Sequence, residues 1–379
     1  MNKLVGLSLF ANVGVAEAGI ENNQNVKIVL ANEIDPKRGE FYKAVHPHTE
    51  MLIGDITDDE VRDTIVTKAS ELGVNFIMAT PPCQGMSEAG NRHEFDTRNE
   101  LIYYAVDVIK RVNPEFVIIE NVPTILRTKI HYQNKVVLIP DYLKAELGSI
   151  YNFNGQTLIK AMDCGVPQMR ERNIFLLARK DSGVKWEFPP KQKVITLKDA
   201  IGHLPSVDPF LREGMEFTLS KFPDFNIKKE NAEKISKWHK PPTHSWKQVN
   251  WMLHTKTGVS AIYNEIYYPQ KDDGTRIVAH HNHYRRMDWE KPARTMTQNN
   301  GVISSLACVH PGREFILNGE KLYSDPRVLT IYELLIVSSL PLDWNIPSWA
   351  NDSFIRKVIG EGIPSKMITV IVEELLKQL

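Results

Sequence analysis

The sequence predicts an α/β fold with a doubly wound, mostly parallel sheet and a second, smaller irregular domain. Short apolar runs that fit buried strands recur between helical patterns in the first half of the chain. Polar residues follow directly where these runs end, and residues 206–286 show no strong periodicity. Open α/β sheets bind ligands at the carboxyl ends of their strands, so the residues after each run are candidates for a site.

The length and composition are those of an ordinary soluble protein. The chain has 379 residues, of which 42% are hydrophobic and 24% charged, which is enough for two domains. Its first residues lack a cleavage pattern and no apolar run could span a bilayer, so we expect a cytoplasmic protein without a membrane partner. Cys83, Cys164 and Cys308 have no paired spacing, which argues against disulfides and against a cysteine-based zinc site.

The charge is balanced overall, with 46 basic and 46 acidic residues, but it is unevenly distributed. Residues 185–290 contain 17 Lys and Arg against 13 Asp and Glu, together with five of the seven tryptophans. This mixture suits a groove that contacts phosphates and bases, and a solvated insertion would have the same composition. Composition alone leaves both interpretations open.

The amino-terminal segment has the pattern of a nucleotide-binding strand, turn and helix. Residues 4–10 form an apolar run, followed by a turn ending at Gly14 and a helical segment over 15–19. The next strand ends before Glu33, about twenty residues past the turn, where a carboxylate can accept from ribose hydroxyls. Since no G-x-G-x-x-G is present, a nucleoside without phosphates, such as S-adenosylmethionine, is favoured over a dinucleotide.

A third apolar run is followed by Gly54, Asp55 and Ile56. From the residues alone, Asp55 has two interpretations. It can accept a hydrogen bond from an exocyclic adenine amine, or it can cap the helix that begins near Asp58.

Two further strand ends carry groups with reactive potential. Residues 79–87 read A-T-P-P-C-Q-G-M-S after an apolar run, so two prolines give Cys83 a rigid position at the edge of the sheet. Some forty residues later, the buried run 116–119 ends at Glu120. A thiol and a carboxylic acid can therefore face each other across one site.

These residues, with the sequences around Phe10, Gln168 and Arg327, resemble the DNA (cytosine-5)-methyltransferases of restriction-modification systems over most of the chain. The resemblance implies a Rossmann-like S-adenosylmethionine-dependent methyltransferase fold with a target-recognition domain. It places the catalytic and cofactor-binding domain at residues 1–190. The recognition domain with its supporting return segment covers 191–343, and 344–379 complete the catalytic domain.

The resemblance implies transfer of a methyl group from S-adenosylmethionine to carbon 5 of cytosine in a short specific duplex sequence, through a covalent cysteine adduct on a flipped-out base. A soft thiolate, from Cys83, would attack carbon 6 once its pKa is lowered. Glu120, with a pKa raised by burial, would serve as the acid at ring nitrogen 3. Arg172 would bind the pyrimidine carbonyl oxygen, and Arg170 and Gln168 would support it or bind the neighbouring phosphate. The strand pattern places all three on one face.

In the same resemblance, Asp55 is the adenine-contacting residue and Glu33 the ribose-binding one. The chain departs from the family motifs at Asn12 and Val15, which replace glycines of F-A-G-x-G-G, and at Glu361, which replaces the asparagine of G-N-x-V-P. Asn tolerates a left-handed backbone, so we expect the turn to be kept. The predicted cofactor-binding residues are Phe10, Ala11, Asn12, Gly14, Glu33, Ile34, Asp55, Ile56, Pro81 and Ile363.

The polar segment 84–98 is rich in Gly, Ser, Asn and charge, and reads as a loop that closes over the target. Rotating a nucleotide out of a duplex costs a few kcal/mol and leaves a gap. We expect Gln84 and Ser87 to fill that gap, and Arg98 to bind a phosphate; with Gln168 these are the predicted DNA contacts.

The segment before residue 287 would supply phosphate anchors and base contacts, among them the run H-H-N-H-Y-R-R at 280–286. The three histidines of this run are also potential zinc ligands. No cysteine or spaced carboxylate accompanies them, so no metal is expected. The sequences around Arg327 and Glu333 resemble the element that supports the recognition domain, and their predicted role is scaffolding.

The predicted partners are double-stranded DNA and, functionally, a restriction endonuclease of the same specificity, with a monomeric protein near the nucleoid of a bacterium or archaeon. Two other functions remain open. One branch of the family modifies transfer RNA, which makes an RNA cytosine-5 methyltransferase the first alternative. The second is a catalytically silent DNA-binding regulator of the same fold, suggested by Asn12 and Val15.

Overall fold

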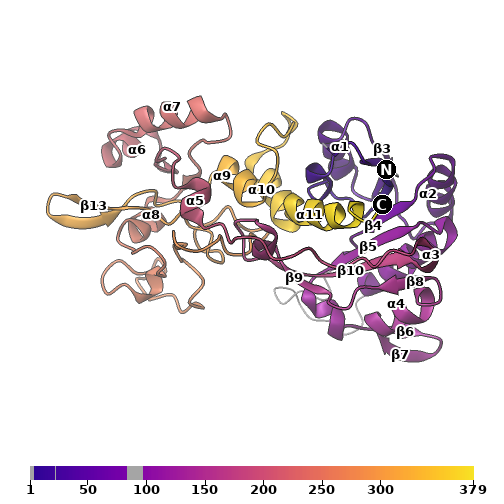
Figure 1. Cartoon of the computed structure of the whole chain (residues 1–379). Coiled ribbons are helices and arrows are strands. Elements are labelled where there is room, and N and C mark those ends of the chain that lie inside the picture. The colour runs from indigo at the N-terminus through magenta and orange to yellow at the C-terminus, as the bar shows by residue number, and fades with distance from the viewer. Residues whose placement is uncertain (1–3, 22, 83–96) are drawn as a thin grey trace.

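The computed structural model describes residues 4–21, 23–82 and 97–379. Figure 1 shows two lobes, a sheet lobe and a largely irregular lobe, with the carboxyl-terminal helices between them. Within the described residues, eight strands make the main sheet: β1 (Leu4–Leu9), β2 (Val26–Glu33), β3 (Glu50–Ile53), β4 (Phe76–Ala79), β5 (Phe116–Asn121), β8 (Tyr151–Phe153), β9 (Leu158–Lys160) and β10 (Glu171–Arg179).

The strand order is β3-β2-β1-β4-β5-β10-β8, with β9 paired to β10. The first five strands are parallel, and β10 runs antiparallel to β5, β8 and β9. The predicted doubly wound, mostly parallel sheet is confirmed. The direction of winding reverses between β1 and β4, and such a reversal opens a crevice at the carboxyl ends of the strands.

The central strands form because their side chains are buried on both faces of the sheet. Every residue of β4 and β5 is buried, and alternate residues belong to different hydrophobic clusters. Ile77 and Ile119 pack toward one face, while Met78 and Ile118 pack toward the other. The first face is covered by α2 (Asp59–Glu71), α3 (Leu101–Val112) and α4 (Ile139–Leu147), and the second by α11 (Ser365–Leu376). Outside these layers lie α1 (Pro36–Val45) beside β3, and the hairpin β6 (Lys129–Tyr132) with β7 (Lys135–Leu138).

The helix expected over residues 15–19 is only a single 3₁₀ turn, η1 (Glu17–Gly19). Here the chain lies against α11, so closely that a Cβ on Gly19 would come within 2.9 Å of the Ser365 backbone. Tertiary packing of this segment outweighs its local helical pattern.

The irregular lobe agrees only in part with its lack of periodicity, because three helices lie between residues 215 and 253. Between η6 (Ala261–Tyr263) and Glu314 the described chain contains only turns and isolated bridges. The regular elements of this lobe are α5 (Leu197–Ile201), β11 (Phe210–Leu211), α6 (Met215–Lys221), α7 (Phe225–Ile235), β12 (Thr243–His244), α8 (Trp246–Leu253), β13 (Glu314–Leu317) and β14 (Glu320–Tyr323).

Arg286 holds this irregular chain together from inside. It was expected among the DNA-contacting residues, but it is fully buried and donates hydrogen bonds to the carbonyl oxygens of Met252, His310, Tyr323 and Asp325. Irregular backbone carries carbonyl groups that no helix or sheet satisfies, and one buried guanidinium satisfies four of them. Burial lowers the pKa of Arg286 to about 9.

A second buried arginine joins this lobe to α9 (Ile331–Val337). Arg327 is 0% exposed and forms ion pairs with Asp325 at 3.0 Å and with Glu333 at 2.8 Å. Glu333 also closes a capping box with Thr330 at the start of α9. Although burial opposes ionisation of Glu333, Arg327 lowers the pKa of this carboxyl to about 2. The scaffolding role expected for Arg327 and Glu333 is confirmed.

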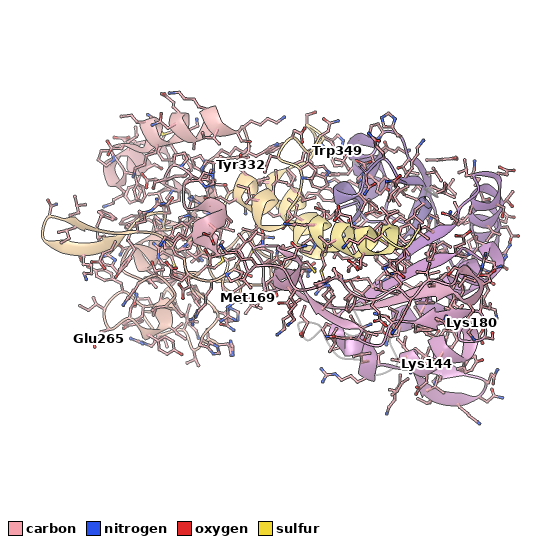
Figure 2. All side chains as sticks on the ribbon, viewed as in Figure 1. Lys144, Met169, Lys180, Glu265, Tyr332 and Trp349 are labelled. Carbon is pink, nitrogen blue, oxygen red and sulfur yellow. The ribbon has the colours of Figure 1, made fainter. Side chains whose placement is uncertain are left out.

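The two lobes meet at the residues that precede β10. The Met169 amide donates to Ala293 O at 2.8 Å, and Figure 2 shows Met169 where the lobes adjoin. Helices α9 and α10 (Asp352–Glu361) pack in one cluster with Val13 and Val15 of the first turn. The return of the chain thus connects the irregular lobe to the edge of the sheet.

None of the described helices combines the length and the apolar character that a membrane crossing requires. Within the same ranges, no group of three or more His, Cys, Asp or Glu side chains is arranged to hold a metal ion.

We predict that Arg327→Met lowers the free energy of unfolding by about 3–5 kcal/mol, because two buried carboxylates lose their cation. Urea unfolding followed by circular dichroism measures this change. The matched control is Lys377→Met, which removes a cation from an exposed ion pair with Glu374 and should cost about 1 kcal/mol or less. Equal destabilisation by the two substitutions would contradict the structural role of Arg327.

Candidate active site

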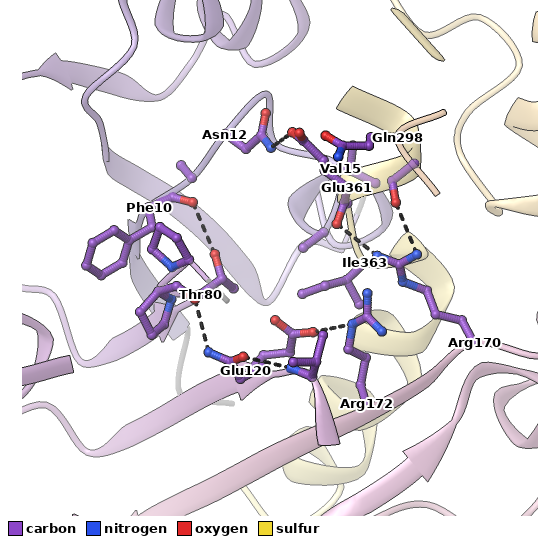
Figure 3. A pocket seen from close by; sticks show the side chains of 18 of the residues that line it. Phe10, Asn12, Val15, Thr80, Glu120, Arg170, Arg172, Gln298, Glu361 and Ile363 are labelled. Atoms are coloured by element: carbon purple, nitrogen blue, oxygen red, sulfur yellow. Dashed lines mark hydrogen bonds and ion pairs between the residues drawn. The ribbon is translucent and has the colours of Figure 1, made fainter. Parts of the chain in front are cut away.

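A cavity of about 1680 Å³ opens at the carboxyl ends of β1, β2, β4 and β5. Ligand pockets usually measure about 300–1000 Å³, so this cavity has room for two ligands side by side. Both lobes contribute to its wall (Figure 3). From the irregular lobe come Asn282, Arg294, Thr295, Thr297, Gln298, Leu306 and Ala307.

The first turn forms one end of the cavity in a left-handed conformation. Phe10, Asn12 and Gly14 have φ of 59°, 51° and 77°. The Asn12 amide donates to Glu33 Oε2 at 2.9 Å, and the amide of Asp35 donates to Glu33 Oε1 at 3.0 Å. The expectation that asparagine keeps the turn is confirmed, and Glu33 ties the turn to the end of β2.

Glycine is required at position 14 because the turn rests on a buried histidine. A Cβ on Gly14 would lie 2.0 Å from His46 Nε2 and 2.9 Å from the Tyr42 ring. The same His46 nitrogen lies 2.9 Å from Gly14 O, while His46 Nδ1 pairs with Glu21 at 2.5 Å. Burial lowers the pKa of His46, but the hydrogen bond with Glu21 and the charges of Glu17 and Glu21 outweigh burial and leave this pKa raised.

Val15, the second departure from the family turn, also has a structural partner. Its side chain faces Gly362, where a Cβ would lie 2.5 Å from Val15 Cβ. The larger residue in the turn is therefore accommodated by a glycine in the returning chain.

The residues after β3 line the cavity beside the turn. Asp55 Oδ1 accepts from the Thr57 amide at 2.9 Å, whereas the N-cap of α2 is Asp58. The helix-cap interpretation of Asp55 is therefore wrong. Asp55, Ile56 and the exposed Ile34 all belong to the cavity wall, as do Ala11 and Ile363.

Glu120 and Arg172 face each other at the deeper end of the cavity. β5 and β10 are paired so that Ile174 lies opposite Glu120, and Arg172 Nε lies 2.8 Å from Glu120 Oε1 (Figure 3). Glu120 is 7% exposed. Burial raises the pKa of the Glu120 carboxyl, and the charges of Arg172 and Arg170 offset only part of that rise. A carboxyl in this state can keep its proton and donate it to a base.

The end of β4 is fixed against both neighbouring strands. Asn121 Nδ2 donates to Pro81 O at 3.1 Å, and Thr80 Oγ1 donates to Phe10 O at 3.1 Å. Pro81 and Pro82 line the cavity, and these contacts hold residues 80–81 between β1 and β5.

Cys83, Gln84 and Ser87 lie outside the described residues. Arg98 belongs to the short helix η2 (Thr97–Glu100), and the contacts of its side chain also lie outside what is described.

Arg170 lines the cavity, and its guanidinium is used to hold the returning chain. It donates to Met296 O at 2.8 Å, Gly360 O at 3.1 Å and Glu361 O at 2.9 Å. Arg170 was expected to assist Arg172. The structure shows that it fixes the end of α10 beside the first turn.

Gln168 does not line the cavity that Arg170 and Arg172 line, so its expected place in the site is corrected. It is 1% exposed, donates to Val337 O at 3.1 Å, and accepts from the Met296 amide at 3.1 Å. The regular strand begins at Glu171, so the alternation of side chains does not extend back to Gln168. Buried and bonded at both ends, it joins the lobes and does not line the cavity.

Arg38 and Glu17 line the cavity although no sequence motif pointed to them. Arg38 pairs with Glu361 at 3.0 Å, although 323 positions separate them in the chain. Glu17, also at the wall, accepts from Ser8 Oγ at 2.5 Å in a buried pair. Neither pair has a fixed spacing or motif, so only the fold brings the partners together.

A family model described as C-5 cytosine-specific DNA methylase matches residues 4–377. Type II methyltransferase M1.HgaI of Avibacterium volantium is 37% identical over 380 residues, which cover 99% of each chain. Type II methyltransferase M.Eco47II of Escherichia coli is 27% identical over 364 residues, or 94% of this chain and 75% of the relative.

Solved structures with the same fold cover nearly the whole chain. A putative DNA modification methyltransferase encoded in an E. coli prophage superposes with a TM-score of 0.66 at 20% identity, over 99% of both chains. DNMT2 of Spodoptera frugiperda superposes with a TM-score of 0.60 at 15% identity, over 99% of this chain and 100% of the other. At these identities the likeness shows the fold alone.

We predict that Gly14→Ala destabilises the protein far more than Gly73→Ala. Both glycines have positive φ, so alanine costs about 1 kcal/mol of backbone strain at either position. Only at Gly14 does the new methyl group meet a side chain, whereas nothing lies within 4 Å of it at Gly73. The extra cost of overpacking should be about 1–3 kcal/mol, measured by urea unfolding. Equal losses of unfolding free energy in the two variants would show that the His46 side chain moves aside without an energetic penalty.

Proposed function

The chain belongs to the C-5 cytosine-specific DNA methylase family, and we propose that it transfers a methyl group from S-adenosylmethionine to carbon 5 of cytosine in a short specific duplex sequence. The observation that carries this proposal is the pairing of buried Glu120 with Arg172 in the cavity that Pro81 and Pro82 also line. Cys83 is the next residue in the sequence after Pro82. A nucleophile, an acid and a cation can thus surround one pyrimidine ring.

Cys83 acts as the nucleophile. Its thiolate forms a carbon–sulfur bond to carbon 6 of cytosine, and the electrons of the 5,6 double bond are then delocalised toward ring nitrogen 3. Glu120 donates its proton to that nitrogen, and Arg172 binds the adjacent carbonyl oxygen. The neutral enamine that results is nucleophilic at carbon 5, which the unmodified base is not.

S-adenosylmethionine supplies an electrophilic methyl group on its sulfonium. After carbon 5 has received it, solvent water removes the proton from that carbon and the electrons expel the Cys83 thiolate. The nitrogen 3 proton returns to Glu120, so the residues end in their starting protonation states.

The end of the cavity that the first turn forms has donors and acceptors that match S-adenosylmethionine. Glu33 and Asp55 offer acceptors for ribose hydroxyls and for an adenine amine, and Ile34 and Ile56 offer apolar contact. Asn12 Oδ1 is a buried acceptor without a hydrogen-bond partner among the described residues. Gly14 keeps the turn free of a side chain that would intrude on His46. We assign Phe10, Ala11, Pro81 and Ile363 to the remaining wall.

Duplex DNA would lie between the two lobes. The target base must leave the helix to reach Glu120, and the residues of the irregular lobe that line the cavity then face the opened duplex. Among these, Arg294 donates to Asn282 Oδ1 at 3.5 Å, which places a cation and an amide at the same wall. We further propose a monomer that acts within a type II restriction-modification system, paired with an endonuclease of the same specificity; the similarity to M1.HgaI supports this setting.

We predict that tritium from labelled S-adenosylmethionine enters duplex DNA and that Cys83→Ala abolishes this transfer. Mixed-sequence DNA and transfer RNA are assayed side by side, and bisulfite sequencing of the methylated DNA identifies the modified cytosines. Label confined to transfer RNA would replace DNA with RNA as the substrate. Cofactor binding without label in either nucleic acid would favour a silent regulator.

We predict that Glu120→Gln lowers kcat by about 10²- to 10⁴-fold, because an amide cannot protonate ring nitrogen 3. In the parent protein the rate should fall as pH rises through the raised pKa of Glu120, since only the neutral carboxyl is an acid. That alkaline limb should be missing from the residual activity of the variant. DNA affinity, measured by fluorescence anisotropy, serves as the control and should change little. A variant with parental kcat would remove Glu120 from the mechanism.

A further inference from the structure

The carboxylate of Glu361 stands at the cofactor end of the cavity, where two residues from distant parts of the chain bind it. Asn12 Nδ2 donates to Glu361 Oε2 at 3.2 Å, and Arg38 Nη2 pairs with the same oxygen at 3.0 Å (Figure 3 shows the Asn12 contact). All three residues line the cavity. The backbone of Glu361 is also fixed, because Arg170 binds its carbonyl oxygen.

Asn12 and Glu361 are two of the three positions at which this chain departs from the family motifs, and here they contact each other. A glycine at position 12 would offer no side chain, and an asparagine at position 361 would carry no charge. The contact therefore creates a polar cluster that the usual residues of the family could not form. We call Asn12, Arg38 and Glu361 the carboxylate cluster.

Two oxygen atoms of this cluster, Glu361 Oε1 and Asn12 Oδ1, accept no hydrogen bond from the described residues. Both contacts of Glu361 go to Oε2, so no described side chain donates to Oε1. A carboxylate can only accept, which requires the Asn12 amide to turn its nitrogen toward Glu361 and its oxygen away. That oxygen, Asn12 Oδ1, is buried and lacks a hydrogen-bond partner within the described structure. Leaving a buried acceptor unpaired costs about 1–3 kcal/mol, so a ligand donor would gain from reaching it.

Arg38 supplies the opposite charge at the same place. Its Nη2 binds Glu361, and its Nε lies 3.8 Å from Asp35 Oδ2, so the guanidinium is held between two carboxylates. A guanidinium has five donors in a planar fork, and a ligand carboxylate can bind those that these pairs do not use. The carboxylate cluster thus combines acceptors for a cation with donors for an anion, as recognition of an amino-acid zwitterion requires.

We propose that the carboxylate cluster recognises the amino-acid end of S-adenosylmethionine: Glu361 Oε1 and Asn12 Oδ1 accept from its α-ammonium, and Arg38 donates to its α-carboxylate. The inference rests on the proposed function for the identity of the cofactor. The position of the cluster supports this assignment. The backbone N–H of Asn12 donates to Glu33 Oε2 at 2.9 Å, and Glu33 is the predicted ribose ligand. The cluster therefore adjoins the nucleoside part of the cavity.

Isothermal titration of the full-length chain with three ligands tests this assignment. S-adenosylmethionine contains the amino-acid end and a sulfonium, whereas 5′-methylthioadenosine has the same nucleoside as a neutral thioether without the amino-acid end. S-adenosylhomocysteine, a neutral thioether that keeps the amino-acid end, is titrated as well to separate the two differences. Glu361→Gln keeps the shape and the acceptors for Asn12 and Arg38 but removes the charge. We expect this variant to bind S-adenosylmethionine on the order of 10- to 100-fold more weakly, S-adenosylhomocysteine to be weakened like S-adenosylmethionine, and 5′-methylthioadenosine to bind with unchanged affinity.

Two further variants complete the test. Glu374→Gln makes the same change on α11, where the carboxylate pairs with exposed Lys377, and should leave both affinities unchanged. Asn12→Gly is compatible with the φ of 51° at this position and should also weaken S-adenosylmethionine selectively. The loss caused by Glu361→Gln should be smaller in the Asn12→Gly background, because the two residues share one ligand group.

The outcomes separate the inference from the proposed function. If the parent protein binds S-adenosylmethionine and Glu361→Gln binds it equally well, or if the variant weakens both ligands alike, the cluster is a scaffold and the inference is overturned. A parent protein that binds neither ligand would overturn the proposed cofactor and the inference together.

Discussion

The active site depends on the balance between burial and charge at Glu120. Removing a carboxylate from water costs several kcal/mol, while a cation at 4 Å returns about 4 kcal/mol at an effective dielectric constant of 20. The pKa of Glu120 is raised because burial exceeds the attraction of Arg172 and Arg170. Burial favours the neutral carboxyl, and the ion pair with Arg172 fixes its position. Both conditions follow from its position at the end of a strand that is buried on both faces.

That position is stable only because other buried polar groups hold the second lobe against the sheet. Gln168 bonds to both Val337 and Met296, Arg170 binds the end of α10, and Arg327 ties residues 325–333 into one unit. Such contacts contribute less stability than an apolar core of equal volume, because their desolvation is costly. They are directional, however, and a lobe with so little regular structure needs directional contacts to keep its cavity-facing residues aligned.

The fold and the deeper half of the site could be predicted from local sequence, because apolar runs and the residues after them encode strand ends directly. Glu120, Arg172 and the turn at Asn12 lie where those patterns place them. Gln168 was expected in the site, but its contacts with Val337 and Met296 bury it outside the cavity, and no local pattern reports those contacts. Arg286 has the sequence context of a phosphate contact, and only the packed structure shows that it serves the interior. Pairs such as Arg38 with Glu361 depend on the return of the chain, which no local pattern reports.

The three departures from the family motifs are easier to understand in pairs than singly. Val15 faces Gly362, so added volume in the turn meets a residue without a side chain. Glu361 adds a negative charge to a cavity wall that Glu33 and Asp35 also line. Arg38 supplies the compensating charge, and Asn12 supplies a donor where glycine would have none. Each departure thus has a contact partner on the opposite side of the cavity. Residues from opposite ends of the chain build this end of the cavity, and their contacts join the first turn to the returning chain.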